Sequence, residues 1–145
     1  MKNFHEFEVS GHAGTLHARL WQPSGVPKAL VVIFHGYAEH GGRYEHVAES
    51  LIANGFAVLA SDHVGHGLSE GERALITDFG LVVEDLDVVI TSAFRNLAID
   101  VPLLVAGHSM GGLLAARFIQ RWPERAIGGA FFGAVIGDWK WAREV

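Results

Sequence analysis

Residues 101–112 have the sequence Val-Pro-Leu-Leu-Val-Ala-Gly-His-Ser-Met-Gly-Gly, and this stretch decides the fold. Its apolar first half predicts a buried strand, and the residues that follow it predict a helix over 113–120. Between them, Gly107, Ser109 and Gly111 form the motif G-x-S-x-G. A strand that turns directly into a helix around a serine forms a nucleophile elbow, in which the serine backbone is strained and its hydroxyl is exposed. We therefore interpret Ser109 as a nucleophile, rather than as an incidental serine in a glycine-rich turn.

The composition predicts one globular domain over residues 1–145. Half of the residues are hydrophobic and 19% are charged, which is typical of a chain that buries a core. The formal net charge of -5 and the lack of a basic cluster argue against a nucleic acid partner. The chain has no cysteine, which excludes disulfides and cysteine chemistry. Since no apolar run resembles a signal peptide or reaches membrane-spanning length, we expect a cytoplasmic protein.

Strands and helices alternate along most of the chain. Loosely alternating apolar residues over 4–21, with Gly11 and Gly14 between them, predict an amino-terminal antiparallel hairpin with one solvated face. The remaining strands are expected at 29–34, 56–61, 101–106 and 127–135, and the helices at 43–53, 79–97 and 113–120. Asp78 is the expected N-cap of the second helix. The pattern predicts an α/β fold with a doubly wound, mostly parallel sheet of about six strands.

Three polar loops that contain glycine follow the predicted strands, at 35–42, 62–71 and 107–111. Ligands of such sheets bind outside the carboxyl ends of the strands, so the three loops are expected to form one site. Acyl transfer also needs donors for the oxyanion, and the backbone amide of Met110 is the first candidate. We expect the second donor to be the amide of Tyr37, beside Gly36, which would let the backbone approach the substrate closely.

The three loops carry motifs that resemble a known family. Residues 34–44, Phe-His-Gly-Tyr-Ala-Glu-His-Gly-Gly-Arg-Tyr, resemble the H-G-x-x-E-H-x-x-R-Y block of the monoacylglycerol lipase and lysophospholipase group of α/β-hydrolases. Residues 62–71, Asp-His-Val-Gly-His-Gly-Leu-Ser-Glu-Gly, resemble its D-H-x-G-H-G-x-S-x-G block, and residues 107–112 match its elbow. Three blocks in the right order are far more specific than the elbow alone. The resemblance covers roughly residues 10–135.

This resemblance implies hydrolysis of lipid esters, typically monoacylglycerols or lysophospholipids, through an acyl-enzyme on Ser109. It implies neither a metal nor an organic cofactor, and a lipid substrate brings with it transient contact with a membrane surface. A peptidase or another acyl hydrolase of the same fold is the alternative within this class, because the elbow does not discriminate between them. An inactive truncated chain, or a domain that binds lipids or a partner without turnover, is the alternative from a different class.

The sequence departs from the family pattern after the elbow. The family's triad has the order Ser, Asp, His, and its last two members lie far downstream of the serine. Here 36 residues follow Ser109 (145 minus 109), and none of them is a histidine. The resemblance therefore implies a single, partial hydrolase domain without the family's lid and last two strands.

The sequence offers other candidates for the acid and the base of the triad. Asp138 follows the last predicted strand, where some α/β-hydrolases place their acid, whereas Glu124 and Glu144 are expected to be solvated. For the base, His108 adjoins the nucleophile but is expected to point away from its hydroxyl across the elbow. His35 is interpreted as a structural or oxyanion-loop residue. No base is assigned.

Asp62, His63 and His66 raise the alternative of a metal site. A hydrogen-bonded turn is the preferred interpretation, because Gly65 and Gly67 indicate a tight loop. The hairpin histidines are interpreted as surface residues; they are His5, His12 and His17.

The last predicted strand, over 127–135, contains no charged residue and would form an edge of the sheet. An apolar edge favours pairing with another chain. We therefore expect self-association or a complementing segment at this edge. Trp139 and Trp141, just beyond it, would lack the lid against which they should pack.

Overall fold

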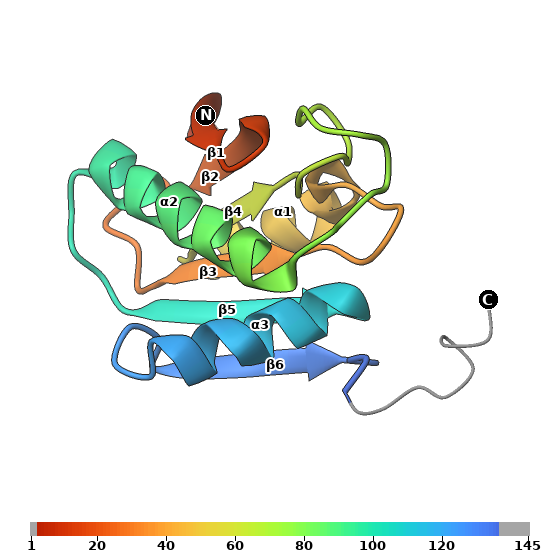
Figure 1. The fold of residues 1–145 in the computed structure, drawn as a ribbon. Coiled ribbons are helices and arrows are strands. Elements are labelled where there is room, and N and C mark those ends of the chain that lie inside the picture. Colours follow the sequence, from red (N-terminus) through yellow and green to blue (C-terminus); the bar gives the residue numbers. More distant parts are fainter. Residues whose placement is uncertain (1–2, 137–145) are drawn as a thin grey trace.

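The computed structural model of the chain describes residues 3–136 and contains a six-stranded sheet with helices on both faces (Figure 1). The strands are β1 (Asn3–Gly11), β2 (Gly14–Gln22), β3 (Leu30–Phe34), β4 (Ala57–Ser61), β5 (Leu103–His108) and β6 (Gly128–Phe132). The helices are the 3-10 helix η1 (Gly41–Tyr44), α1 (Glu45–Ala53), α2 (Phe79–Leu97) and α3 (Met110–Arg121). The expectations for Asp138, Trp139, Trp141 and Glu144 lie outside the described residues.

The sheet has the strand order β1-β2-β4-β3-β5-β6. β1 and β2 form the predicted antiparallel hairpin, and β2 also pairs antiparallel with β4. The other neighbours, β4-β3, β3-β5 and β5-β6, are parallel. All five residues of β3 are buried, because this central strand has strands on both sides and helices over both faces. The predicted doubly wound, mostly parallel α/β sheet is confirmed.

The prediction of one solvated face was wrong for β2. Exposure alternates along β1, but six consecutive residues of β2 are buried. The reason is that β2 lies between β1 and β4, with α2 near one face and η1 and α1 near the other. His17, predicted at the surface, is therefore only 8% exposed. Of the other two hairpin histidines, His5 is half-buried, and His12 is exposed with its Nδ1 2.7 Å from Asp85 Oδ2.

Two helix starts show how side chains and close approaches set the element boundaries. α2 begins as predicted, with Asp78 Oδ1 accepting hydrogen bonds from the N–H groups of Gly80 and Leu81. The helix expected at 43–53 instead begins as η1. There, a Cβ on Gly41 would lie 3.1 Å from the backbone of Ala60, so this first turn packs directly on β4.

The last strand is shorter than predicted, because it ends at Phe132 rather than at residue 135. Gly133 has a φ of 54°, which turns the chain out of the sheet. The backbone N–H of Val135 then donates to the carbonyl of Ser109 at 3.3 Å. The segment after β6 therefore lies over the elbow.

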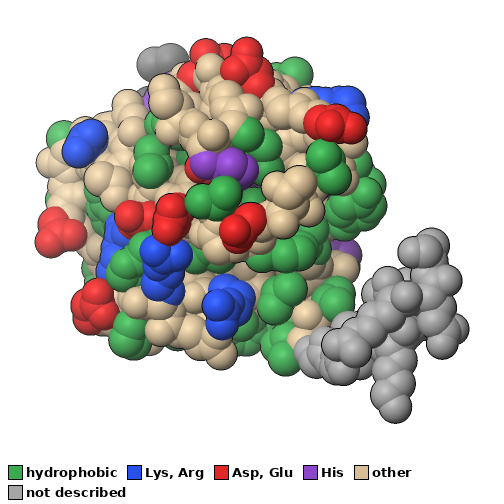
Figure 2. All heavy atoms as spheres, in the orientation of Figure 1, with side chains coloured by type: hydrophobic (Ala, Val, Ile, Leu, Met, Phe, Trp, Pro, Cys, Tyr) green, Lys and Arg blue, Asp and Glu red, His purple; other side chains and the backbone are tan. Residues whose placement is uncertain are grey.

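Two hydrophobic layers form the core. The larger lies between the sheet and the α2–α3 side; its largest fully buried members are Phe34, Phe118, Leu20, Leu30, Leu59, Ile90, Leu103 and Leu114. The smaller lies under α1 and contains Trp21, Val31, Ile33, Ala48, Val58 and Ala60. Figure 2 shows Lys and Arg side chains scattered among acidic ones on the face that carries α2 and α3. No helix within residues 3–136 combines the length and apolar character needed to cross a membrane.

β6 forms one edge of the sheet described here and exposes large apolar side chains at and beside it. Ile127 is 71% exposed and Phe132 is 59% exposed. We predict that the isolated chain self-associates at micromolar concentration, because an uncharged edge strand offers unpaired backbone groups to another chain. Size-exclusion chromatography with light scattering measures this directly.

A lysine on an edge strand disfavours strand pairing, so Phe131→Lys should shift the chain toward the monomer. Val26→Lys is the matched control, since Val26 is exposed but lies outside every strand. A clean monomer of the unaltered chain, or an equal response to both substitutions, would contradict this prediction.

Candidate active site

The turn from β5 into α3 holds Ser109 in a strained conformation. Its backbone has φ 55° and ψ -118°, in the region that residues other than glycine rarely adopt. A Cβ on Gly107 would collide with the backbone of Gly111, and a Cβ on Gly111 would collide with the carbonyl of Phe34. The first turn of α3 therefore packs directly against the ends of β5 and β3. Only glycine fits at these two positions.

The loop after β3 lies beside the elbow. A Cβ on Gly36 would lie 3.4 Å from the carbonyl oxygen of His108, the residue before Ser109. Among the described residues, the backbone N–H groups of Tyr37 and Met110 donate to no protein acceptor. An unpaired N–H at Met110 is expected, because it is the first residue of α3. Two free amide donors thus belong to the segments that flank Ser109.

Glu39 holds the loop after β3 in shape. Its Oε2 accepts hydrogen bonds from the Gly36 N–H at 2.8 Å and from the Tyr44 hydroxyl at 3.0 Å, and its Oε1 pairs with Arg43. His108 Nδ1 lies 3.5 Å from the same carboxylate. Partial burial alone would raise the pKa of Glu39, but these hydrogen bonds and charges lower it. Burial and the carboxylate raise the pKa of Tyr44 to about 12.

The sequence alone does not indicate this role of Glu39. The four-residue spacing of Glu39 and Arg43 is compatible with an ion pair between them. This spacing does not indicate the hydrogen bond from the Gly36 amide to Glu39.

His35 uses both ring nitrogens within the fold. Its Nδ1 lies 2.7 Å from the carbonyl of Gly36, and its Nε2 lies 2.9 Å from the N–H of His63. Since the His63 N–H must donate, Nε2 is the acceptor and Nδ1 carries the proton. Burial lowers the pKa of His35 to about 4. The arrangement is that of a neutral, structural imidazole, rather than a group free to exchange protons with a substrate.

Asp62, His63 and His66, the residues of the alternative metal site, lie in a hydrogen-bonded turn. The His63 ring donates from Nε2 to the carbonyl of His35 at 3.0 Å, and its pKa is well below the usual value because of burial. The His66 ring donates from Nδ1 to the carbonyl of Val64 at 2.8 Å. Gly65 has a positive φ, of 71°, as the tight-loop interpretation requires. Within residues 3–136, no group of three or more His, Asp or Glu side chains is arranged to hold a metal ion.

Asp62 joins three parts of the site. Its fully buried carboxylate accepts hydrogen bonds from Arg19 on β2 at 2.8 Å, from the Gly41 N–H at 2.7 Å and from the Leu68 N–H at 2.9 Å. Burial would raise the pKa of Asp62, but these donors outweigh it and lower the pKa. The pairing of Asp62 with Arg19, 43 residues apart, carries no sequence signal.

The loops that the sequence predicts to form the site thus lie at the carboxyl ends of the parallel strands β3, β4 and β5. Gly36, Tyr37 and Ser109 lie on adjacent segments, whereas Glu124 is exposed outside the helices and strands. Together with the sheet, this arrangement defines an α/β-hydrolase fold. Residues 25–144 match the family described as serine aminopeptidase, S33, and the chain belongs to this family.

Monoglyceride lipases are among the relatives of the chain. It is 45% identical over 128 residues to the monoglyceride lipase of Homo sapiens, a match that covers 88% of this chain and 40% of that protein. The crystal structure of the Paleococcus ferrophilus monoacylglycerol lipase superposes with a TM-score of 0.67 at 27% identity, covering 95% of this chain and 45% of the other. A thermostable carboxyl esterase from Bacillus coagulans, in complex with glycerol, superposes with a TM-score of 0.77 at 26% identity. The match covers 87% of this chain and 43% of the esterase. The chain therefore spans less than half the length of these relatives.

Acidification is predicted to destabilise the fold below neutral pH. The pKa of His35 is about 4 in the folded chain, whereas a solvent-exposed histidine, as in the unfolded chain, has a pKa of 6.5. Between these two pH values the unfolded chain therefore binds a proton that the folded chain excludes. The free energy of unfolding should fall as the pH drops from about 6.5 toward about 4, by on the order of 3 kcal/mol for His35, and His63 acts in the same direction. Urea unfolding at pH 7.0, 5.5 and 4.5 measures this change.

His46→Asn is the control for this experiment, because His46 is exposed on α1 and its substitution leaves the buried histidines in place. Equal stability at pH 7.0 and 4.5 would show that the buried histidines are not held neutral.

Asp62→Asn should lower the free energy of unfolding by about 3 kcal/mol, because it leaves the buried Arg19 guanidinium with only Glu6, 3.6 Å away and half-exposed, as a counter-charge. Asp100→Asn, on an exposed loop, should change it by less than about 0.5 kcal/mol. Chemical denaturation of the two variants at neutral pH makes the comparison. Similar stabilities would argue against Asp62 as the residue that joins the loops.

Proposed function

We propose that the chain carries the nucleophile and oxyanion site of a serine hydrolase that cleaves carboxylic esters of lipids. The observation that carries this proposal is the strained Ser109, with φ 55°, flanked by segments whose Tyr37 and Met110 amides are free. A serine held in this way presents its hydroxyl at the carboxyl end of the sheet. Two free N–H groups beside it are suited to a developing negative charge.

In the proposed reaction, Ser109 Oγ attacks the ester carbonyl while a base accepts the hydroxyl proton. The carbonyl oxygen becomes an oxyanion that accepts hydrogen bonds from the amides of Tyr37 and Met110, and Gly36 allows the close approach. The C–O bond then breaks, the alcohol leaves with the proton, and an acyl-enzyme remains on Ser109. Water releases the fatty acid by the same route.

The relatives favour monoacylglycerols as substrates, and the sequence motifs imply lysophospholipids as a related class. Human monoglyceride lipase, 45% identical to this chain, supports a lipid ester with one acyl chain. The family description, serine aminopeptidase, supports an amide substrate as the second candidate. Because the identity to the lipase extends over 88% of the chain, we favour the ester.

We further propose that the base and the acid of the triad come from outside residues 3–136. All nine histidines of the sequence lie within those residues. His35 and His63 are buried and hydrogen-bonded to the backbone, and His108 faces Glu39. With no base assigned to the isolated chain, Ser109 should react slowly.

A fluorophosphonate probe followed by intact-mass analysis tests the role of Ser109. The folded chain should gain one adduct slowly, and imidazole added to the buffer should accelerate this several-fold by acting as the external base. Ser109→Ala should gain none under either condition.

Two results would decide against the proposal. Labelling that survives Ser109→Ala would place the reactive group elsewhere. No labelling of the folded chain, with or without imidazole, would mean that the elbow serves a non-catalytic domain.

A further inference from the structure

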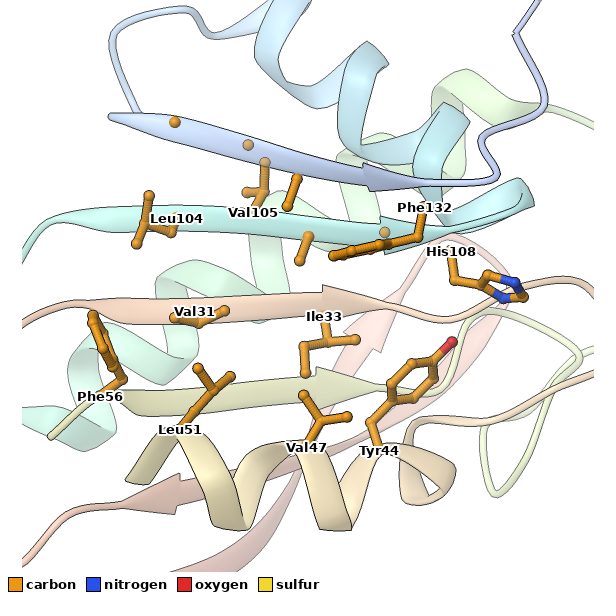
Figure 3. Close-up of a pocket in the computed structure, with 15 residues that line it drawn as sticks. Val31, Ile33, Tyr44, Val47, Leu51, Phe56, Leu104, Val105, His108 and Phe132 are labelled. Carbon is orange, nitrogen blue, oxygen red and sulfur yellow. The ribbon is translucent and has the colours of Figure 1, made fainter. Parts of the chain in front are cut away.

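An apolar groove of about 700 Å³ lies on the α1 side of the sheet, between α1 and the strands β3, β5 and β6 (Figure 3). Val47 and Leu51 of α1 belong to one wall. Among the side chains that line the groove, those of Tyr44 and His108, at one end, carry the polar atoms. Both approach Glu39, whose Oε2 accepts a hydrogen bond from the Tyr44 hydroxyl at 3.0 Å and lies 3.5 Å from His108 Nδ1. The polar end of the groove is therefore joined to this carboxylate.

The same carboxylate oxygen binds the loop after β3. Glu39 Oε2 accepts a hydrogen bond from the Gly36 N–H at 2.8 Å, and a Cβ on Gly36 would lie 2.9 Å from this oxygen. The backbone N–H of Glu39 donates in turn to the carbonyl of Gly36 at 3.3 Å, which closes a four-residue turn. Ala38, the third residue of this turn, has a φ of 57°, a positive value as in a type II turn. Glu39 thus binds both backbone groups of Gly36.

The peptides before and after Gly36 are held in fixed directions. A peptide group is planar, so a partner on its carbonyl also sets the direction of its N–H. The peptide before Gly36 is held at its carbonyl by His63 Nε2 and at its N–H by Glu39. The peptide after Gly36 is held at its carbonyl by His35 Nδ1, at 2.7 Å, and by the Glu39 N–H. Its own N–H, that of Tyr37, donates to no acceptor within residues 3–136 and is therefore a free amide with a fixed direction.

Gly36 is the point at which this loop can rotate. Glycine has the widest range of backbone conformations, so the two peptides that it joins turn independently unless both are held. The buried rings of His35 and His63 hold one carbonyl each. Glu39 holds the N–H before Gly36 and also binds the carbonyl after it, so it connects the two peptides. Arg43 pairs with the other carboxylate oxygen and leaves Oε2 for these contacts.

We propose that Glu39 is a positioning residue for the ester cleavage: its side chain holds the backbone around Gly36 so that the Tyr37 N–H points at the oxyanion. This role rests on the proposed function, because Tyr37 is an oxyanion donor only in that reaction. Glu39 acts through the reach of its acceptor oxygen and not through its charge, since a negative charge does not favour an oxyanion. It is expected to contact neither the substrate nor the reacting atoms.

The test compares two fluorophosphonate probes on the folded chain in imidazole buffer. With either probe the bond between Ser109 Oγ and phosphorus forms, the P–F bond breaks, fluoride leaves and imidazole takes the hydroxyl proton. The first probe carries a phosphoryl oxygen, which occupies the place of the oxyanion. In the second probe sulfur, a weak hydrogen-bond acceptor, replaces this oxygen. The ratio of the two labelling rates therefore reports the oxyanion donors, whereas a less accessible Ser109 slows both probes alike.

Two variants separate the reach of Glu39 from its charge. Glu39→Gln keeps the length of the side chain and an oxygen that can accept the Gly36 N–H, whereas Glu39→Asp keeps the charge and is one methylene shorter. The oxygen-to-sulfur rate ratio should stay within about twofold in Glu39→Gln and fall about tenfold in Glu39→Asp, less than the loss of about 100-fold or more on deleting a donor. Glu45→Asp is the matched control, because Glu45 is exposed on α1, and it should leave the ratio unchanged. Circular dichroism shows whether each variant is folded.

A second measurement does not use the reactivity of Ser109. Hydrogen exchange of the Gly36 amide, followed by NMR, reports the hydrogen bond from this N–H to Glu39. Exchange should be slow in the unaltered chain and in Glu39→Gln, and about tenfold faster in Glu39→Asp.

Three results would overturn the positioning role: an unchanged rate ratio in Glu39→Asp, a ratio that falls in Glu39→Gln as much as or more than in Glu39→Asp, or rapid exchange of the Gly36 amide in the unaltered chain. The second result would assign the effect to the charge of Glu39. If neither probe labels the unaltered chain, the proposed function itself fails, and the positioning role fails with it. The two failures are therefore distinguishable.

Discussion

The contact between Gly111 and the carbonyl of Phe34 is the constraint on which the site depends. It brings the first turn of α3 to backbone distance from the end of β3, and the contact of Gly107 with the same turn fixes β5 beside it. Ser109 lies between these two glycines and adopts φ 55°. The strain is local, and burial of α3, β3 and β5 in the larger core layer offsets it.

The loops around this turn are held by neutral imidazoles and by one buried ion pair. The rings of His35 and His63 lie 3.9 Å apart, and each binds the backbone of the other residue. Burial keeps their pKa values low, so they fix the loops without introducing charge. Asp62 supplies the charge and is balanced by Arg19. These groups shape the site, so the base of the proposed reaction is expected elsewhere.

The two faces of the sheet differ in how completely they are covered. α2 and α3 cover one face, while α1 leaves the apolar groove beside β5 and β6 on the other. The groove reaches the elbow at one end, where Gly107 and His108 belong to its lining.

The sequence by itself determined the parallel α/β sheet, the cap at Asp78 and the segments around Ser109, because periodicity, capping and glycine spacing are local properties. It did not determine the burial of His17, the pairing of Asp62 with Arg19, the early end of β6 or the groove. Each of these depends on which strands become neighbours and on what covers them. His17 has the same local sequence in an exposed hairpin as in a buried one, and only the position of β2 between β1 and β4 decides between them.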